Sequence, residues 1–548
     1  MTPLDAGREA ARHIWFNWRK ASYVKPDDPF LSEFSAGALL EFERLQEEAP
    51  GLLHAMADGA QKGAQQLNLD DYHGVMEVIQ NADDLFATEV VVSLRVGSTG
   101  SQELLIFHDG EPVSIHHVLA MNYAFISTKV DDPQQKGKFG VGLKTLGRIA
   151  DRMEVHSSTY SFAIENQRIK SIDVCPVIEG LYKPGKRSTL ICLRLFESFE
   201  KEKFLEWFSS LDASILLFLD TVSTFRFVPS EASDPTIAHI LDKAPTSTTI
   251  FTAEENTGFG AVSACQYWDK VTGREWEKFQ FKVDVPKSVG RSHKQTGKET
   301  LLGLALPKAP SRQKIYAGLP TYIRTDLPFS LDAQFDPDTS REKLLNTPWN
   351  KWLIQKMADL FTMVAIGLGK RSPERVWNLI PLDDEMDFED AVLKANFADA
   401  FNEALVRVEE DLRFNIFGRD LPLANISYEV EALEGLLDVG DYSCLHPETV
   451  GLPEKLRDES GRWRKVVNEL NCSQEISVAD SFRLFENDDL CQRKAPQWFV
   501  DILLAALHTK TTKPIFTFPC LLLVDGLRTS AQDPDSNTEL LVRDNQLE

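Results

Sequence analysis

Two short segments of the chain carry the residue types that a metal and nucleotide site needs. The first, EVIQNADD at residues 77–84, predicts a helix with Glu77, Asn81 and Asp84 on one face, because positions i, i+4 and i+7 share a side of an α-helix. Val78, Ala82 and Leu85 form a neighbouring apolar stripe that could pack on a core. Two carboxylates and an amide beside a buried stripe have the layout of a metal–nucleotide site. An amphipathic helix with a solvated face remains the alternative.

The second segment, GKFGVGLKT at residues 137–145, is rich in glycine and is followed by an apolar run to residue 150 that resembles a helix. Glycine allows backbone amides to approach phosphate oxygens, and the start of a following helix attracts anions. The segment has neither the GxxxxGK[ST] spacing nor the strand–GxGxxG–helix context of the commonest phosphate loops.

Between these segments the alternating run 89–96, a polar turn and residues 103–107 predict a β-hairpin that ends in His108-Asp109-Gly110. A carboxylate at that point can accept a hydrogen bond from an exocyclic amine such as that of adenine. An ordinary turn aspartate is the alternative.

The order of these pieces, continued by Thr189 in the strand STLICLRL, resembles the GHKL superfamily, the ATPase domain shared by gyrase, heat-shock-ninety chaperones, histidine kinases and MutL proteins. Within it, FHDGEPVS, FISTK and GKFGVGLKT look most similar to the sacsin-like and NO VEIN-like ATP-binding proteins. The resemblance implies a Bergerat-type sandwich of helices on a mixed, mainly antiparallel sheet, and it implies ATP and Mg²⁺ as ligands.

The resemblance also implies a role for each matching residue. Glu77 matches the general base that deprotonates the attacking water, and Asn81 matches the Mg²⁺ ligand. Asp84 matches a polar residue near the sugar and base. Asp109, with Gly110, matches the adenine anchor, and Thr189 its hydroxyl partner.

The same resemblance implies a lid over the phosphates. Its matching residues, together with a preceding lysine, are Lys129, Gly137, Lys138, Phe139, Gly140, Val141, Gly142 and Lys144. Lys144 could meet phosphate charge, or it could be a surface lysine. The chain departs from the family in one respect, because the usual DxGxG reads Asp109-Gly110-Glu111-Pro112 and lacks the second glycine.

Length and composition predict a multidomain α/β (α+β) protein, since 548 residues with 43% hydrophobic content can build several cores. We expect a helical N-terminal extension, the ATP-binding domain, a mixed α/β middle domain and an α/β C-terminal region of unknown role, at 1–65, 66–228, 237–370 and 371–548. Helices are expected near 390–412 and 498–508.

The string SREKL in the middle region places Arg341 in a context similar to that of a chaperone arginine that reaches the γ-phosphate. A planar, permanently charged guanidinium suits that catalytic task. The alternative is a helix start capped by residues 338–340, with Arg341 solvated.

Charge and cysteine content restrict the environment and the partners. The net charge of −24 opposes broad adsorption to nucleic acid or anionic membranes, so direct nucleic-acid binding is not expected. The seven cysteines are scattered and form no CxxC pair, and no secretory leader is apparent, so we expect a cytoplasmic protein. The sequence has no long apolar run, so we do not expect it to enter the membrane.

Three functional readings follow. The first is a Mg-dependent ATPase that works as a nucleotide-driven switch, for instance a regulatory or sensor component of a prokaryotic anti-phage defence system, with a nucleotide-dependent homodimer and a protein effector as partners. The second is an ATP-dependent chaperone. The third is a nucleotide-binding module that does not hydrolyse ATP. Neither a phosphoacceptor histidine helix nor a DNA-cleavage domain is apparent, which disfavours a histidine kinase and a topoisomerase.

Overall fold

The computed structural model describes residues 1–17, 32–48, 72–97, 100–122, 142–166, 168–178, 181–183, 187–229, 236–245, 248–251, 261–289, 298–309, 311–338, 340–458, 460–470, 473–522 and 528–529. They fall into two compact units. The first comprises 1–361 and 384–401, and the second comprises 362–383 and the residues from 402 onward. This is a mixed α/β, multidomain protein, as the composition predicts.

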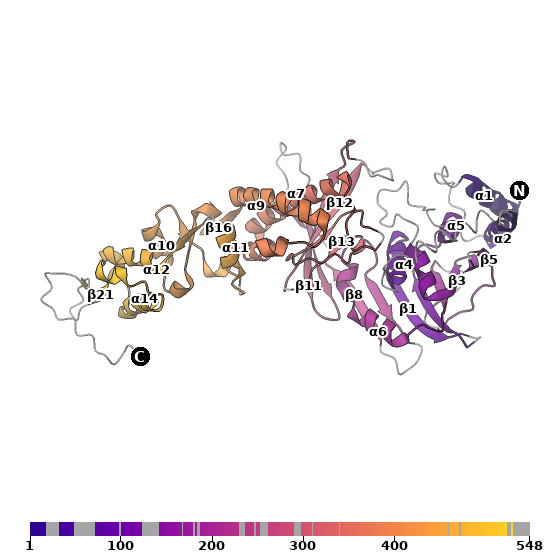
Figure 1. The fold of residues 1–548 in the computed structure, drawn as a ribbon, viewed down its shortest axis with the longest axis horizontal. Helices are drawn as coiled ribbons and strands as arrows, with labels where there is room; N and C mark the ends of the chain where they lie inside the picture. Colours follow the sequence, from indigo (N-terminus) through magenta and orange to yellow (C-terminus); the bar gives the residue numbers. More distant parts are fainter. Residues whose placement is uncertain are drawn as a thin grey trace. The chain divides into compact units, whose positions relative to one another are not determined.

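The N-terminal half of the first unit is built on an antiparallel set of strands in the order β1-β2-β6-β3-β4-β5 (Figure 1). Their bounds are β1 Glu89–Val96, β2 Gln102–His108, β6 Thr189–Leu195, β3 Ala150–Ser157, β4 Tyr160–Glu165 and β5 Arg168–Ser171. The predicted hairpin is confirmed, because β1 and β2 pair antiparallel from Val90 opposite His108 to Val96 opposite Gln102.

The sheet continues without a break into the predicted middle region. β7 pairs parallel with β1 and antiparallel with β8, so the strands on either side of residues 229–236 belong to one sheet. The order then runs β8-β10-β11-β12-β15-β13-β14, with β9 beside β10. The bounds are β7 Thr224–Phe227, β8 Ile237–Lys243, β9 Thr248–Phe251, β10 Val262–Asp269, β11 Glu275–Asp284, β12 Glu299–Pro307, β13 Ile315–Ala317, β14 Leu319–Pro320 and β15 Ser330–Asp332.

Helices bury one face of this sheet. Alternate residues of β1 and β2, such as Val92 and Ile106, share a core with Val75, Val78 and Ile79 of one helix. The helices of this part are α1 Pro3–Asn17, α2 Ser32–Glu48, α4 His73–Asp84, α5 Ile115–Asn122 and α6 Lys201–Ser210, with 3₁₀ turns η1 Gly142–Arg148 and η2 Ala213–Leu216.

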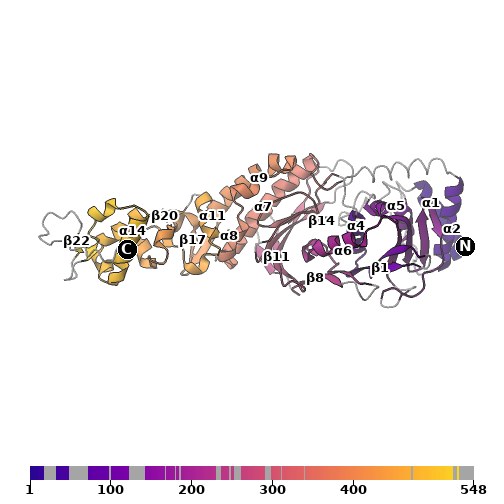
Figure 2. The same ribbon diagram turned by 60° about the horizontal axis from the view of Figure 1, so that its bottom comes forward.

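The helix α2 covers the edge strand β5 (Figures 1 and 2). The Gln46 side-chain amide donates to the Ile169 carbonyl over 3.1 Å and accepts from the Ile169 amide over 2.8 Å. An amide side chain thus stands in for the missing neighbouring strand, which satisfies an edge that would otherwise expose its backbone groups.

Two long helices, α7 Pro348–Arg371 and α9 Ala391–Asp411, contribute residues to both units, and α9 confirms the helix expected near 390–412. The second unit has a core of aromatic residues that includes Phe482, Phe485 and Trp498. Its elements are α8 Val376–Leu379, β16 Arg413–Ile416, β17 Arg419–Pro422, β18 Ile426–Glu429, α10 Val439–Leu445, β19 Val450–Gly451, α11 Arg462–Leu470, β20 Gln474–Ile476, α12 Val478–Ser481, α13 Asp488–Cys491, α14 Pro496–His508, β21 Leu521–Leu522 and β22 Arg528–Thr529.

The helix expected near 498–508 is therefore confirmed as α14. Among the residues that the structure describes, no helix combines the length and the apolar character that crossing a membrane requires.

Candidate functional site

The helix α4 presents the three polar residues that the sequence singles out on one partly open face. Its residues from His73 to Asp83 are buried except at Glu77 and Asn81, and the next half-buried position is Asp84. The predicted helix and its face are therefore confirmed. On a helix so deeply packed, Glu77, Asn81 and Asp84 are the positions with partial exposure.

A buried aspartate on the same helix fixes its position against the sheet. The Asp83 carboxylate accepts hydrogen bonds from the backbone amides of Asp220, Thr221 and Val222, over 2.7 to 3.0 Å for Oδ1. Those amides lead directly into β7, the neighbour of β1. Asp83 is therefore an anchor for α4, a role that the sequence analysis did not assign.

The Asp109 side chain ties the end of β2 to the start of β1. Its carboxylate accepts from the amides of Thr88 and Glu89, over 2.7 and 3.0 Å, and from the Thr88 hydroxyl. Burial acts to raise the pKa of Asp109, but the hydrogen bonds from the Thr88 hydroxyl and from these amides outweigh it and lower the pKa. The carboxylate is held ionised at the mouth of the hairpin, where adenine contact stays a prediction.

Gly110 lies where the chain passes closest to the end of α4. A Cβ at this position would stand 2.6 Å from the Leu85 carbonyl oxygen and 2.9 Å from the Ala87 amide nitrogen. The next amide, that of Glu111, donates to the same Leu85 carbonyl over 2.6 Å. The Asp-Gly segment is thus packed directly against the residues that follow Asp84.

Thr189 lies in β6 directly opposite His108 of β2. Its buried hydroxyl is hydrogen bonded to the Ser157 hydroxyl over 2.7 Å, and Ser157 also accepts from the Val113 amide over 2.9 Å. Burial lowers the pKa of His108 to about 4, so this imidazole is neutral at physiological pH. Ser157 and His108 belong to the surroundings of the predicted adenine anchor, and the sequence analysis assigned a role to neither.

Most of the predicted lid lies outside the described residues, namely Lys129, Gly137, Lys138, Phe139, Gly140 and Val141. The described part begins with η1, which contains Gly142 and Lys144. The expectation of a helix up to residue 150 is wrong at its end, because Ala150 already pairs with Leu195 as the first residue of β3.

The segment η1 packs on the N-terminal part of α4. A Cβ on Gly74 would stand 2.8 Å from the Leu146 amide nitrogen and from the Thr145 hydroxyl. The missing side chain at Gly74 therefore allows the end of the predicted lid to approach the helix that carries Glu77.

Arg341 projects from a tight loop in which Pro337 and Leu344 form an isolated β-bridge. The expected alternative, a capped helix start with Arg341 in solvent, is wrong. The nearest following helix begins at Pro348, and Arg341 is 8% exposed. Its backbone φ of +59° is in the left-handed region that residues with a side chain rarely adopt. The Asp338 carboxylate, which accepts from the Glu342 amide over 3.1 Å, supports this turn.

The guanidinium of Arg341 is held firmly and points to the predicted base. Its Nη2 donates to the carbonyls of Ala317 and Leu319, over 3.0 and 2.8 Å, and its Nη1 lies 3.7 Å from Glu77 Oε1. Its Nε has no hydrogen-bond partner among the described residues. Burial lowers the pKa of Arg341, and Glu77 is the main group that opposes this.

A histidine at the start of α4 reaches the same carboxylate oxygen. His73 Nε2 lies 3.3 Å from Glu77 Oε1, and the two side chains are 7% and 16% exposed. The i, i+4 spacing of His73 and Glu77 is visible in the sequence, but only the burial of both side chains marks the pair as more than a surface contact. Glu77 therefore lies between an imidazole from its own helix and a guanidinium from the middle region.

The structure thus brings Glu77, Asn81 and Asp84 onto one face, with Arg341 at its N-terminal end and Gly110 packed behind its C-terminal end. No group of three or more His, Cys, Asp or Glu side chains suited to a metal occurs within the described ranges. A Mg²⁺ ion that takes one ligand from Asn81 needs no such group, because Mg²⁺ is usually bound through one or two protein ligands, water and phosphate oxygens.

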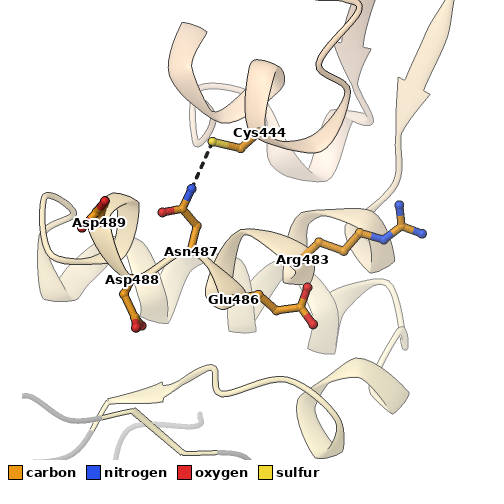
Figure 3. A pocket seen from close by; sticks show the side chains of 6 residues that line it. All are labelled: Cys444, Arg483, Glu486, Asn487, Asp488 and Asp489. Atoms are coloured by element: carbon orange, nitrogen blue, oxygen red, sulfur yellow. Dashed lines mark hydrogen bonds between the residues drawn. The ribbon is translucent and has the colours of Figure 1, made fainter.

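The second unit contains a shallow hollow of about 450 Å³ that lies apart from these residues in the sequence (Figure 3). It is lined by Cys444, Arg483, Glu486, Asn487, Asp488 and Asp489. The Asn487 amide donates to the Cys444 sulfur over 3.5 Å, and three of the six lining residues are acidic. None of the residues that the sequence analysis selected lines it.

No protein-family model matches the chain. The chain is 22% identical over 369 residues to Protein NO VEIN of Arabidopsis thaliana. The matched region covers 62% of this chain and 12% of that protein, so the chain spans only a small part of the relative's length. What the comparison establishes is a weak, distant similarity to NO VEIN, in agreement at that level with the resemblance expected from the sequence motifs.

Proposed function

We propose that this chain binds Mg-ATP and hydrolyses it, with Glu77 as the general base, and that the bound nucleotide acts as a conformational switch. The observation that carries the proposal is the arrangement around α4. One partly open face of a buried helix holds a carboxylate, an amide and a second carboxylate, and a buried arginine from the middle region reaches the first carboxylate. A Bergerat-type arrangement and a sacsin-like ancestry belong to the same proposal.

The residues present fit a magnesium nucleotide. Asn81 supplies an amide oxygen on the open face, and this single protein ligand leaves the remaining positions for water and phosphate oxygens. Bound there, Mg²⁺ would neutralise the charge that develops on the phosphates. Asp84 lies one turn further along α4, before the residues on which the Asp-Gly segment packs, and would contact the sugar and base.

Glu77 would act on the attacking water, and Arg341 would act on the γ-phosphoryl group. The carboxylate accepts the proton of the attacking water, a contribution of about 10²- to 10⁴-fold in rate. The guanidinium provides positive charge for the γ-phosphoryl group, and its two carbonyl contacts fix its orientation before any ligand arrives. His73 contacts the same oxygen of Glu77 and would position it.

The switch follows from where these groups are attached. Glu77 belongs to α4, whereas Arg341 belongs to a loop of the middle region, so a nucleotide that engages both would bias how that loop and α4 contact each other. We further propose a nucleotide-dependent homodimer and a protein effector as the output, in a regulatory or sensor role such as anti-phage defence.

The test is phosphate release from Mg-ATP by the purified chain and by Glu77→Gln and Arg341→Lys variants. Glu206→Gln on α6 and Lys343→Ala beside Arg341 are matched controls, because both residues are exposed and neither belongs to the site. We expect both controls to retain activity, and we expect Glu77→Gln to lose it while still binding ATP. ATP binding without hydrolysis by the wild type would support a binding module instead, and no ATP binding at all would refute the proposal.

A further inference from the structure

The face of the sheet opposite α4 carries a small separate core that contains two cysteines. Cys192 lies in β6, opposite Leu105 of β2 and opposite Glu154 of β3. Its neighbours along the strand, Ile191 and Leu193, belong to the main core on the other face, whereas Cys192 belongs to the small core. Strand alternation therefore fixes the side on which the Cys192 thiol lies.

Cys175 reaches the same place from the segment that follows β5. Its amide donates to His156 Nδ1 over 3.3 Å, and His156 is two residues from the Glu154 that pairs with Cys192. Cys175 and Cys192 belong to one hydrophobic cluster, are 8% and 5% exposed, and are both free thiols. Two thiols from distant points of the chain are thus neighbours on one face.

The charges around the pair separate the two sulfurs into an acceptor and a donor. The hydrogen bond with Cys192 lowers the pKa of Cys175, against the effect of burial and of Glu154, and His156 and Arg95 lower it further. The same hydrogen bond and burial raise the pKa of Cys192. Tyr182 also faces the pair. A thiolate beside a protonated thiol is the arrangement in which one sulfur attacks and the other resolves.

We propose that Cys175 and Cys192 form a site of oxidation by hydrogen peroxide. The Cys175 thiolate attacks the peroxide, so that an S–O bond forms, the O–O bond breaks, and hydroxide leaves and is protonated to water. The Cys192 sulfur then attacks the sulfenic acid at Cys175, forming the S–S bond, while the hydroxyl leaves with the Cys192 proton as a second water. Two thiols are oxidised to a disulfide and one peroxide is reduced to two waters.

The disulfide would fix the segment that carries Cys175 to β6, the strand that also carries Thr189. The two residues stand on opposite faces of that strand, because Thr189 and Cys192 are separated by an odd number of positions. The inference does not depend on nucleotide chemistry and can be tested without ATP.

The experiment treats the reduced full chain with hydrogen peroxide, blocks remaining thiols, and maps disulfides by mass spectrometry of non-reduced peptides. We expect a Cys175–Cys192 linkage before oxidation of the exposed Cys444, which serves as the internal control. Two substitutions separate the roles of Cys192. Cys192→Ser retains a hydroxyl donor but cannot resolve, so Cys175 should accumulate as a sulfenic acid that dimedone traps. Cys192→Ala removes the donor as well.

Alkylation of Cys175 by iodoacetamide gives a second readout. In the reduced wild type its rate should rise with pH around a midpoint below the ordinary pKa of a cysteine thiol, and in Cys192→Ala that midpoint should move upward, since the stabilising hydrogen bond is lost. Circular dichroism confirms that each variant is folded. Oxidation of Cys444 without any Cys175–Cys192 linkage, or no trapped sulfenic acid at Cys175 in a folded Cys192→Ser variant, would overturn the proposal.

Discussion

Asp83 and Asp84 are adjacent and chemically identical, but we expect their replacement by asparagine to affect different properties, namely the stability of the fold and the binding of ATP. Asp83 is 4% exposed and accepts from three consecutive backbone amides at residues 220–222. Asp84 is half-buried on the face that we assign to the nucleotide. Asp83→Asn should therefore loosen the attachment of α4, whereas Asp84→Asn should leave the fold intact and weaken ATP binding.

The size of the Asp83 effect follows from its hydrogen bonds. A hydrogen bond to a charged group contributes about 1.5–3 kcal/mol and a neutral one about 0.5–1.5 kcal/mol, so loss of the charge weakens each contact. Asparagine also turns one acceptor into a donor, and an amide left without a partner costs about 1–3 kcal/mol. The segment 220–222 should thus open more easily by roughly 2–4 kcal/mol, or roughly 30- to 700-fold in its opening equilibrium.

Hydrogen–deuterium exchange of the full chain measures this opening locally. Peptides that contain residues 220–222 should exchange faster by that factor in Asp83→Asn, while peptides of the second unit serve as the internal control. Asp84→Asn should leave their exchange unchanged and raise the dissociation constant for ATP by roughly tenfold or more. Equal exchange in wild type and Asp83→Asn, or faster exchange in Asp84→Asn, would refute the assignment of anchor and ligand.

Three further outcomes are expected. Gly110→Ala should lower the midpoint of thermal unfolding, at a cost of about 1–3 kcal/mol, because its Cβ would meet the Leu85 carbonyl at 2.6 Å; an unchanged midpoint would show that the segment can relax. His73 contacts the carboxylate of Glu77 and would position it, so His73→Ala should lower kcat for ATP by roughly 10- to 100-fold with KM nearly unchanged. His73→Gln should rescue the activity in part, and an effect on KM alone would contradict the positioning of the base. The Glu41 carboxylate on α2 accepts hydrogen bonds from Arg44 of the same helix and, over 2.6 Å, from Arg12 of α1, and these lower the pKa of Glu41 to about 2 despite burial. The docking of α1 on α2 should therefore weaken as the pH falls from 4.5 toward 2; hydrogen exchange of α1 should show this, and Glu41→Gln should remove the pH dependence.

The parts of the site that rest on local periodicity were predictable from the sequence. The face of α4 follows from the spacing of Glu77, Asn81 and Asp84, and the β1–β2 hairpin follows from alternation and a polar turn. The point at which the helical segment after Gly142 ends could not be predicted from the sequence. Ala150 belongs to β3 because it pairs with Leu195, a residue distant in sequence.

Other parts depend on tertiary packing and could not be deduced. Helical spacing places Asp84 on the face of Glu77 and Asn81, but nothing local shows that Asp83 is an anchor, because its partners at residues 220–222 are distant in sequence. The meeting of Arg341 with Glu77 requires a loop with a positive φ that a capped helix start would not predict. The neighbouring thiols of Cys175 and Cys192 are likewise brought together by the sheet and by the segment that crosses it.

Phosphate release from Mg-ATP by the wild type beside Glu77→Gln tests the central claim most directly, since the proposed hydrolysis depends on Glu77 as the base. Both proteins should bind ATP equally, and the wild type should hydrolyse it about 10²- to 10⁴-fold faster than the variant. Equal hydrolysis by the two proteins would contradict Glu77 as the base and, with it, the assignment of α4 as the catalytic helix.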